Sequence, residues 1–183
     1  NDNFGALTIP LAALNPLCYG DSWMSRKATE LNCKSNHILT PLTFEENLDT
    51  LTHNHQPPDC VIGRVPKSTS QFIYILKTLN TWLNENTLLM FAGMDKHLSR
   101  GQYDLIEKYF GPSTYLPGVK KSRIWQARCN KKLIASMPKH TKVIIPEHTL
   151  TLTSYPNVFS RNKLDIGSRF FLNNLSRIPI RDQ

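Results

Sequence analysis

Residues 59–83 read DCVIGRVPKSTSQFIYILKTLNTWL, and they place a short apolar run before an amphipathic one. The apolar run is typical of a strand that is buried in a parallel sheet. In the second part, apolar residues return at the i, i+3, i+4 and i+7 spacing of one helix face. They are Phe72, Ile75, Leu76, Leu79 and Leu83. We therefore predict a strand over residues 59–65 and a helix over residues 69–83.

The same alternation continues on both sides of this unit. Strands that alternate with helices are typical of βαβ units and indicate an α/β fold with a mostly parallel sheet. Further strands are expected at residues 17–20 and 87–92, and further helices at residues 6–14, 23–36 and 99–110.

Two short segments around Pro117-Gly118 change the pattern. Residues 114–116 and 123–129 are predicted to pair as antiparallel strands, with the basic turn Lys120-Lys121 between them. A terminal antiparallel pair on an otherwise parallel sheet is typical of methyltransferase-type Rossmann-like folds. The predicted fold over residues 1–135 is therefore α/β, with a mostly parallel sheet of that type.

Residues 136–183 are expected to form an appendage outside this sheet. Leu150 and Leu152 alternate with threonines, which predicts a strand with one buried face. Pro146-Glu147-His148 would form the turn of a hairpin. The linker, the two hairpin strands and a helix are expected at residues 136–142, 143–145, 149–153 and 163–175.

The predicted helix over residues 163–175 has Ser160 as its expected N-cap. Phe170 and Phe171 are adjacent and therefore point about 100° apart, so we expect one of them to be exposed. The buried face of the helix is expected to hold Leu164, Phe171 and Leu175.

Composition favours a globular cytoplasmic protein without a metal. The chain has 183 residues, 40% of them hydrophobic, which suits one α/β domain with a small appendage. No run approaches the roughly 18 apolar residues of a membrane span, and no signal peptide is visible. The four cysteines form no C-x-x-C pair, which favours free thiols in a reducing cytoplasm and argues against zinc.

The positive charge is concentrated in one part of the chain, residues 108–146, which we term the basic window. These 39 residues contain nine basic side chains and no acid, whereas the rest of the chain has 13 Lys and Arg against 14 Asp and Glu. The window therefore carries +9 and the rest of the chain −1, so the whole net charge of +8 comes from the window. Such an excess indicates a polyanionic partner such as RNA, or alternatively a solvated face that aids solubility. The basic residues are Lys108, Lys120, Lys121, Arg123, Arg128, Lys131, Lys132, Lys139 and Lys142.

Two further features bear on RNA contact. Arg64 and Lys67 follow the predicted strand at residues 59–65 and are candidates for phosphate contacts. Trp125 lies among the cations of the basic window and could stack a base, although a tryptophan on a strand is more often part of the core.

The N-terminal turn resembles a cofactor-binding loop that keeps only one of its glycines. In nucleotide-binding α/β folds, a Gly-rich turn approaches the ligand and an acid after the second strand binds the ribose. Gly5 and Asp21 have about the right interval, but Gly5 is the only glycine of its turn and the bulky Phe4 precedes it. We therefore treat Gly5 and Asp21 as vestigial cofactor residues within a packed turn.

Residues 53–60, HNHQPPDC, gather imidazole, carboxylate and thiol groups, which raises the possibility of a metal site. Two prolines stiffen the segment and no second ligand cluster exists, so we predict a polar loop and no metal.

Residues 157–172 read NVFSRNKLDIGSRFFL, and this string closely resembles the lead-in to the catalytic domain of bacterial ribosomal RNA guanine-N(2)-methyltransferases. These are two-domain enzymes that act on small- or large-subunit RNA, and the resemblance is nearest to the N-terminal domain of the large-subunit kind. It extends in order along essentially the whole chain but is most specific after Tyr155.

The resemblance implies a division of labour between two similar halves. In that family only the C-terminal copy binds S-adenosylmethionine, in a Gly-rich turn that is expected beyond Gln183. Phe159, Ser160 and Arg161 would then lie beside that pocket as accessory residues. The family's Asn-Pro-Pro-Phe/Tyr catalytic motif survives after residues 59–62 only as Pro66, so no catalytic residue is expected in this chain.

Taken together, the residues and the resemblance favour a non-catalytic, RNA-recognising N-terminal domain. The parent enzyme would use S-adenosylmethionine to methylate a guanine of large-subunit ribosomal RNA, with its own C-terminal catalytic domain as partner. The RNA contacts are expected at Lys120, Lys121, Arg123, Arg128, Lys131, Lys132, Arg64 and Lys67. The alternatives are a complete small methyltransferase that uses Gly5 and Asp21, and a purely structural or dimerising half.

Overall fold

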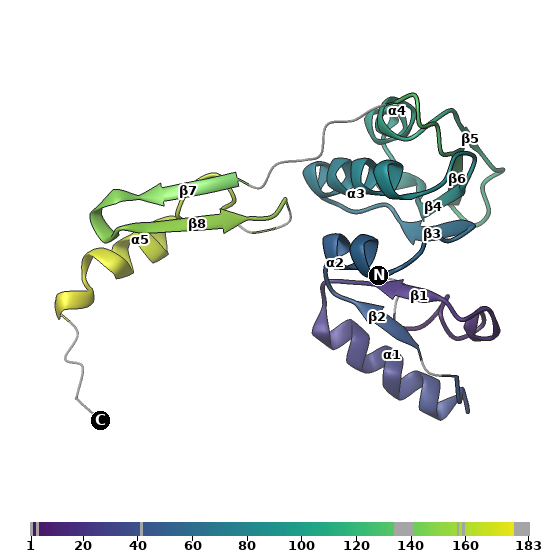
Figure 1. Ribbon diagram of the computed structural model, residues 1–183, viewed down its shortest axis with the longest axis horizontal. Helices are drawn as coiled ribbons and strands as arrows, with labels where there is room; N and C mark the ends of the chain where they lie inside the picture. Colours follow the sequence, from purple (N-terminus) through teal and green to yellow (C-terminus); the bar gives the residue numbers. More distant parts are fainter. Residues whose placement is uncertain are drawn as a thin grey trace. The chain divides into compact units, whose positions relative to one another are not determined.

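The computed structural model describes residues 2, 4–40, 42–133, 141–156, 158 and 160–177. Contacts within the chain divide it into two compact units, Asn1–Met137 and Pro138–Gln183 (Figure 1). No helix among the described residues is long and apolar enough to cross a membrane.

The first unit alternates strands and helices along the chain, as the sequence predicts. Its strands are β1 (Leu17–Tyr19), β2 (Thr43–Glu45), β3 (Cys60–Arg64), β4 (Leu88–Met94), β5 (Ser113–Tyr115) and β6 (Ser122–Arg128). Its helices are α1 (Trp23–Ser35), α2 (Leu48–Asn54), α3 (Thr69–Trp82) and α4 (Arg100–Tyr109), with short 3-10 turns η1 (Ala12–Leu14) and η2 (Asp95–His97).

The strands of this unit form two sheets. Strands β1 and β2 pair in parallel, and a four-stranded sheet has the order β3-β4-β6-β5. In that sheet β3 and β4 are parallel, while β6 is antiparallel to both β4 and β5. The predicted antiparallel pair is thus confirmed, and the four-stranded sheet is mixed because this pair supplies half of its strands.

The prediction of a helix over residues 6–14 is wrong. The segment forms successive turns and ends in η1. Pro10 has no amide hydrogen and cannot donate to the preceding turn, so a regular helix cannot run through it.

Strand β2 and helix α2 were not predicted. Helix α2 begins at Asn47, whose side chain accepts a hydrogen bond from the Asp49 amide, 2.8 Å away. It extends into the segment predicted as a polar loop. Just after α2, His55 Nε2 lies 2.8 Å from Glu45 Oε1, which links the end of the helix to β2.

The core lies where α3 and α4 cover the four-stranded sheet (Figure 1). Phe72 and Leu76 on α3 are fully buried, and Phe72 meets Phe91 of β4 edge to face with ring centres 5.3 Å apart. Trp125 of β6 is only 5% exposed, so it belongs to the core. The large buried aromatic area fixes the position of β6 and of the loop that precedes it.

The second unit contains a hairpin and a helix. Strands β7 (Thr141–Ile145) and β8 (Leu150–Ser154) are antiparallel and joined by η3 (Pro146–His148), which confirms the predicted hairpin. Helix α5 (Ile166–Asn173) and the turn η4 (Leu175–Arg177) follow. Of the predicted linker, residues 136–140 lie outside the described residues, and Thr141 and Lys142 belong to β7.

Two details of the second unit differ from prediction. The N-cap of α5 is Asp165, whose carboxylate accepts from the amides of Gly167 and Ser168, so the helix starts later than residue 163. The strand β8 has no buried residue, and Leu150 and Leu152 are both exposed.

Of the predicted buried face, Phe171 is exposed, whereas Leu164 and Leu175 are half-buried. Phe170 is 70% exposed and Phe171 is 56% exposed, although only one of them was expected to be. The hairpin and α5 therefore leave apolar surface uncovered within the described part of this unit.

Candidate nucleic-acid interface

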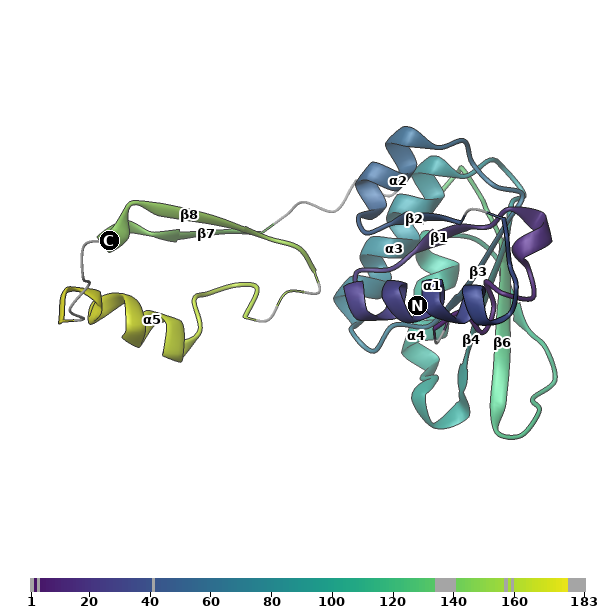
Figure 2. The ribbon, with the colours of Figure 1, turned by 90° about the horizontal axis from the view of Figure 1, so that it is seen from below.

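One edge of the four-stranded sheet collects most of the basic residues of interest. The carboxyl ends of the parallel strands β3 and β4 meet there, and Met94 at the end of β4 pairs with Ser122 at the start of β6 (Figure 2). In open α/β sheets, ligands bind outside the carboxyl ends of the strands. Six basic side chains lie at or just beyond this edge, and we term them the carboxyl-edge cluster: Arg64, Lys67, Lys96, Lys120, Lys121 and Arg123.

Lys120 and Lys121 form the tip of the hairpin that leads into β6. Val119 and Ser122 exchange two main-chain hydrogen bonds of 2.9 Å, and the two lysines between them have φ values of 48° and 61°. Positive φ at both central residues is the geometry of a type I′ turn, which suits the twist of a hairpin. Both side chains are exposed, so the turn presents two adjacent ammonium groups to solvent.

Arg123 is held in place by an acid and an aromatic ring. Its Nε lies 3.3 Å from Asp95 Oδ1, and its guanidinium carbon lies 5.0 Å from the centre of the Tyr115 ring. The Asp95 amide also donates to the Lys121 carbonyl oxygen at 2.9 Å. The end of β4 and the lysine turn are thus tied together, and the cluster keeps a net positive charge because Asp95 offsets only part of it.

Lys96 was not among the predicted site residues. It lies in η2, directly after β4, and its side chain is exposed. Asp104 and Glu107 separate it from the acid-free basic window that starts at Lys108, so the charge pattern of the sequence did not mark it. The position of Lys96 soon after the predicted strand at residues 87–92 could have identified it as a candidate site residue.

The loop after β3 brings Arg64 and Lys67 to the same edge. Gln102, on the first turn of α4, donates from Nε2 to the Pro66 carbonyl oxygen at 3.4 Å. This contact holds the loop against the start of α4, while the side chains of Arg64 and Lys67 remain exposed. Their predicted phosphate contacts stay a prediction.

The structure separates the remaining predicted residues from this cluster. Arg128 pairs with Leu88 at the amino end of β4, so the length of β6, about 20 Å, lies between it and Ser122. Lys131 and Lys132 follow at that far end. Strand β6 thus carries the basic residues of the basic window to opposite edges of the sheet.

Lys131 and Arg128 also have partners within the protein. Lys131 Nζ donates to the carbonyl oxygens of Asn80 and Thr81, the latter at 3.0 Å, and so caps the C-terminal end of α3. Arg128 donates from a guanidinium nitrogen to the Asn86 carbonyl oxygen at 3.1 Å. These contacts compete with a phosphate for both cations. The carboxyl-edge cluster is the better candidate site because, although Asp95 engages Arg123, Lys120 and Lys121 are exposed at the tip of their turn.

The turn at Gly5 is closed by the carboxylate of Asp2. Asp2 accepts hydrogen bonds from the Gly5 amide at 3.0 Å, from the Thr8 amide at 2.9 Å and from the Thr8 hydroxyl. Burial would raise the pKa of Asp2, but these hydrogen bonds outweigh it and hold the pKa below its ordinary value. The amides that would approach a cofactor are therefore already bound to an internal anion.

The rest of this turn is closely packed. Gly5 is buried with φ of +102°, and a Cβ added there would lie 2.9 Å from Ile9 Cδ1. The Phe4 carbonyl oxygen accepts from Asn32 Nδ2 at 2.8 Å. Asp21 is exposed beyond β1, beside Ser22, which caps α1. The close packing and the internal hydrogen bonds of this turn disfavour a cofactor role for Gly5 and Asp21.

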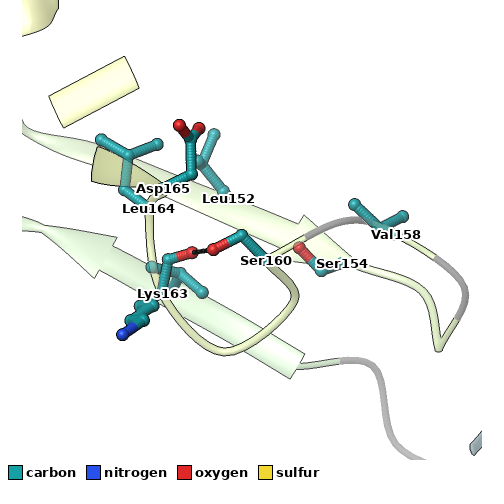
Figure 3. A pocket seen from close by; sticks show the side chains of 8 residues that line it. Leu152, Ser154, Val158, Ser160, Lys163, Leu164 and Asp165 are labelled. Atoms are coloured by element: carbon teal, nitrogen blue, oxygen red, sulfur yellow. Dashed lines mark hydrogen bonds between the residues drawn. The ribbon is translucent and has the colours of Figure 1, made fainter. Parts of the chain in front are cut away.

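A small hollow of about 110 Å³ lies in the second unit, between the hairpin and the segment that leads to α5 (Figure 3). Ser160 lines it and donates from Oγ to the Lys163 carbonyl oxygen at 2.8 Å. Arg161 donates from Nε to Thr141 Oγ1 of β7 at 2.8 Å. The segment is thus fastened to the hairpin. Phe159 lies outside the described residues, and the accessory cofactor role of Phe159, Ser160 and Arg161 stays a prediction.

The described residues give little support for a metal site or for a reactive cysteine thiol. Among the described residues no group of three or more His, Cys, Asp or Glu side chains could hold a metal ion. Burial raises the pKa of the thiols of Cys18, Cys33, Cys60 and Cys129, which disfavours the reactive thiolate.

Comparison with solved structures identifies the fold. The chain is similar to the T. thermophilus 16S rRNA N2 G1207 methyltransferase (RsmC) in complex with AdoMet and guanosine, with a TM-score of 0.68 and 16% identity over 93% of this chain and 45% of that chain. It is also similar to an rRNA methylase from Streptococcus thermophilus (TM-score 0.55, 11% identity, 70% of this chain, 82% of that chain). A putative rRNA methylase from Clostridium thermocellum gives a TM-score of 0.56 at 9% identity, over 71% of this chain and 86% of that chain.

These likenesses confirm the expected α/β fold of the methyltransferase-type, Rossmann-like kind. The chain spans less than half of the T. thermophilus enzyme. The sequence model of the RLMG N-terminal domain matches residues 1–131, well over half of the chain. The chain therefore belongs to the RLMG N-terminal domain family.

Proposed function

We propose that this chain is the RNA-recognition part of an S-adenosylmethionine-dependent ribosomal RNA guanine-N(2)-methyltransferase, and that it has no catalytic residues of its own. Residues 1–135 would hold the large-subunit RNA, and residues 136–183 would lead into the catalytic domain that binds the cofactor. The family membership supports the enzyme class. The observation that carries the RNA role is the lysine turn at the carboxyl edge of the sheet.

The carboxyl-edge cluster suits a phosphate backbone better than a small anion. Its side chains come from strand ends and from three separate loops, after β3, after β4 and before β6, and several of them are exposed lysines. Lysine ammonium groups on flexible stems attract phosphates without reading bases. The cluster would therefore position the RNA and leave base selection to the catalytic domain.

The closed turn at Gly5 supports the non-catalytic role. Asp2 occupies the amides that a cofactor would need, so the rival proposal of a complete small methyltransferase lacks a binding loop. The exposed Phe170 and Phe171 support docking of a further domain onto the second unit, because such a domain would remove their apolar surface from water.

The test is the salt dependence of RNA binding by the 183-residue chain. Fluorescence anisotropy with a labelled ribosomal RNA fragment would be measured over a range of salt concentrations. Three to five phosphate contacts predict a slope of log K against log salt on the order of −2 to −4. The double variant Lys120→Ala/Lys121→Ala should flatten this slope by about 1.5 and weaken binding alike for RNAs of different sequence.

The matched control removes the same charge from the opposite edge of the sheet. Arg128→Ala/Lys132→Ala should change the slope much less. Equal effects of the two double variants would contradict the assignment to the carboxyl edge. If the chain binds no RNA even at low salt, the recognition role is wrong and a structural or dimerising half is preferred.

A further inference from the structure

An exposed aromatic ring lies in the hairpin that carries the lysine turn. Tyr115 ends β5 and is 59% exposed, whereas its cross-strand neighbour Trp125 is 5% exposed. Trp125 was the aromatic that the sequence offered for base stacking, but its ring is covered by the core. Tyr115 is the aromatic of this hairpin that a base could reach.

The Tyr115 ring is held in position by its neighbours. Tyr103 of α4 meets it edge to face with ring centres 6.3 Å apart, and Tyr103 also packs against Trp125 at 5.8 Å. The Tyr103 hydroxyl donates to the Ser113 carbonyl oxygen of β5. An exposed ring that is fixed before binding loses little conformational entropy when a ligand stacks on it.

Arg123 adds a cationic plane to this ring. Its guanidinium carbon lies 5.0 Å from the ring centre, and its Nε lies 3.3 Å from Asp95 Oδ1. Unpaired bases stack both on aromatic rings and on guanidinium planes.

We propose that Tyr115 and Arg123 form a stacking platform for an unpaired base of single-stranded RNA, while Lys120 and Lys121 contact phosphates of the same strand. This inference rests on the proposed RNA-recognition function and names the form of RNA that the site takes. Tyr115 pairs with Trp125, which lies roughly 13 Å along β6 from the lysine turn. A short single strand can therefore reach both the Tyr115 ring and the two lysines. In a duplex, the neighbouring base pairs stack on both faces of each base, so a duplex can use the lysines alone.

The experiment compares a labelled single-stranded RNA 12-mer with the same RNA annealed to its complement. Tyr115→Leu should weaken binding of the single strand roughly 5- to 100-fold and leave duplex binding unchanged. The salt slope should stay the same, because no phosphate contact is lost. Tyr115→Phe and Tyr115→Trp keep a ring and should retain binding within about twofold.

A second measurement uses the unaltered chain, in case Tyr115→Leu does not fold. Single-stranded RNA that carries 5-iodouracil is irradiated with the protein, and the crosslinked peptide is identified by mass spectrometry. A crosslink at Tyr115 supports stacking. Crosslinks that avoid residues 113–125, or single-strand affinity unchanged in a folded Tyr115→Leu chain, would overturn the platform while the lysine-dependent binding stands. Absence of all RNA binding would instead remove the underlying function.

Discussion

The side-chain amide of Asn80, near the end of α3, donates a hydrogen bond of 3.1 Å to the carbonyl oxygen of Phe110, where α4 ends. The same amide donates to the Asn130 carbonyl oxygen at 3.1 Å. Asn80 is 3% exposed, so its side-chain amide is shielded from water. One buried polar side chain thus joins α3, α4 and the segment that follows β6.

Replacing Asn80 with alanine should destabilise the first unit. Each carbonyl oxygen loses one of its two donors, which costs about 1–2 kcal/mol of unfolding free energy. The Phe110 oxygen still accepts from the Asn130 amide, and the Asn130 oxygen still accepts from the Leu133 amide. Urea denaturation followed by circular dichroism measures this loss. Asn84→Ala, at an exposed position, is the matched control and should change stability by less than about 0.5 kcal/mol. Similar midpoints for the two variants would contradict the bridging role.

Two glycines should respond to alanine in opposite directions. A Cβ at Gly111 would lie 2.0 Å from the main-chain oxygen of Arg128, which cannot move without breaking the end of β6. A Cβ at Gly101, an exposed position on α4, meets only Ser99 Oγ at 4.0 Å. Gly111→Ala should therefore prevent folding or lower the melting temperature sharply. Gly101→Ala should raise stability by about 0.5–1 kcal/mol, and a loss there would refute this account of the helix.

Adjacent lysines after β6 should differ in effect. Lys131→Met removes a cation that caps the C-terminal carbonyls of α3 and should cost about 0.5–1 kcal/mol of stability. Lys132→Met should leave the melting temperature nearly unchanged. Thermal unfolding at low salt distinguishes them. If Lys131→Met instead weakens RNA binding without affecting stability, Lys131 contacts RNA as the sequence first indicated.

The chain should not bind S-adenosylmethionine measurably. Gly5 and Thr8 amides already donate to Asp2, and the turn is packed against Ile9. Calorimetric titration of the cofactor into the chain tests this expectation. Micromolar affinity that disappears in Asp21→Ala would revive the complete-methyltransferase alternative, since it corresponds to about −8 kcal/mol of specific binding.

Asp2 should make the N-terminal turn sensitive to acid. Its pKa in the folded chain lies below the ordinary value of 3.8, because the hydrogen bonds from Thr8 and Gly5 favour the carboxylate. Its stabilising contribution is therefore fully present above pH 3.8 and is lost as the pH falls through the lower folded-state value. The stability difference between the unaltered chain and Asp2→Asn should shrink in that range. A difference that is constant with pH would show that the charge contributes nothing.

Long periodic segments were predictable, and short ones were not. Helix α3 carries 14 residues of repeated apolar spacing, so it could be predicted from sequence alone. Strand β2 has only three residues and α2 only seven, which is too short for a period to emerge. Ser160 and Asp165 both suit an N-cap, and only the backbone conformation decides in favour of Asp165.

The candidate site was predictable in composition but not in arrangement. The basic window identified Lys120, Lys121 and Arg123, because charge is visible in sequence. It could not show that β6 carries Arg128 to the opposite edge, since a strand of seven residues separates its ends in space. The sequence analysis also did not identify Tyr115. Whether Tyr115 or Trp125 faces water depends on the neighbouring strands, and their arrangement is not visible in the sequence.

The left-handed backbone at Lys120 and Lys121 has a consequence for protein engineering. A side chain at positive φ costs roughly 1–2 kcal/mol, and asparagine followed by glycine fits this turn much better. A laboratory selection for thermostability would therefore favour that pair and would discard both lysines in the same step. Heat-stable versions of this domain obtained in that way should be assayed for their ligand before they are adopted as substitutes.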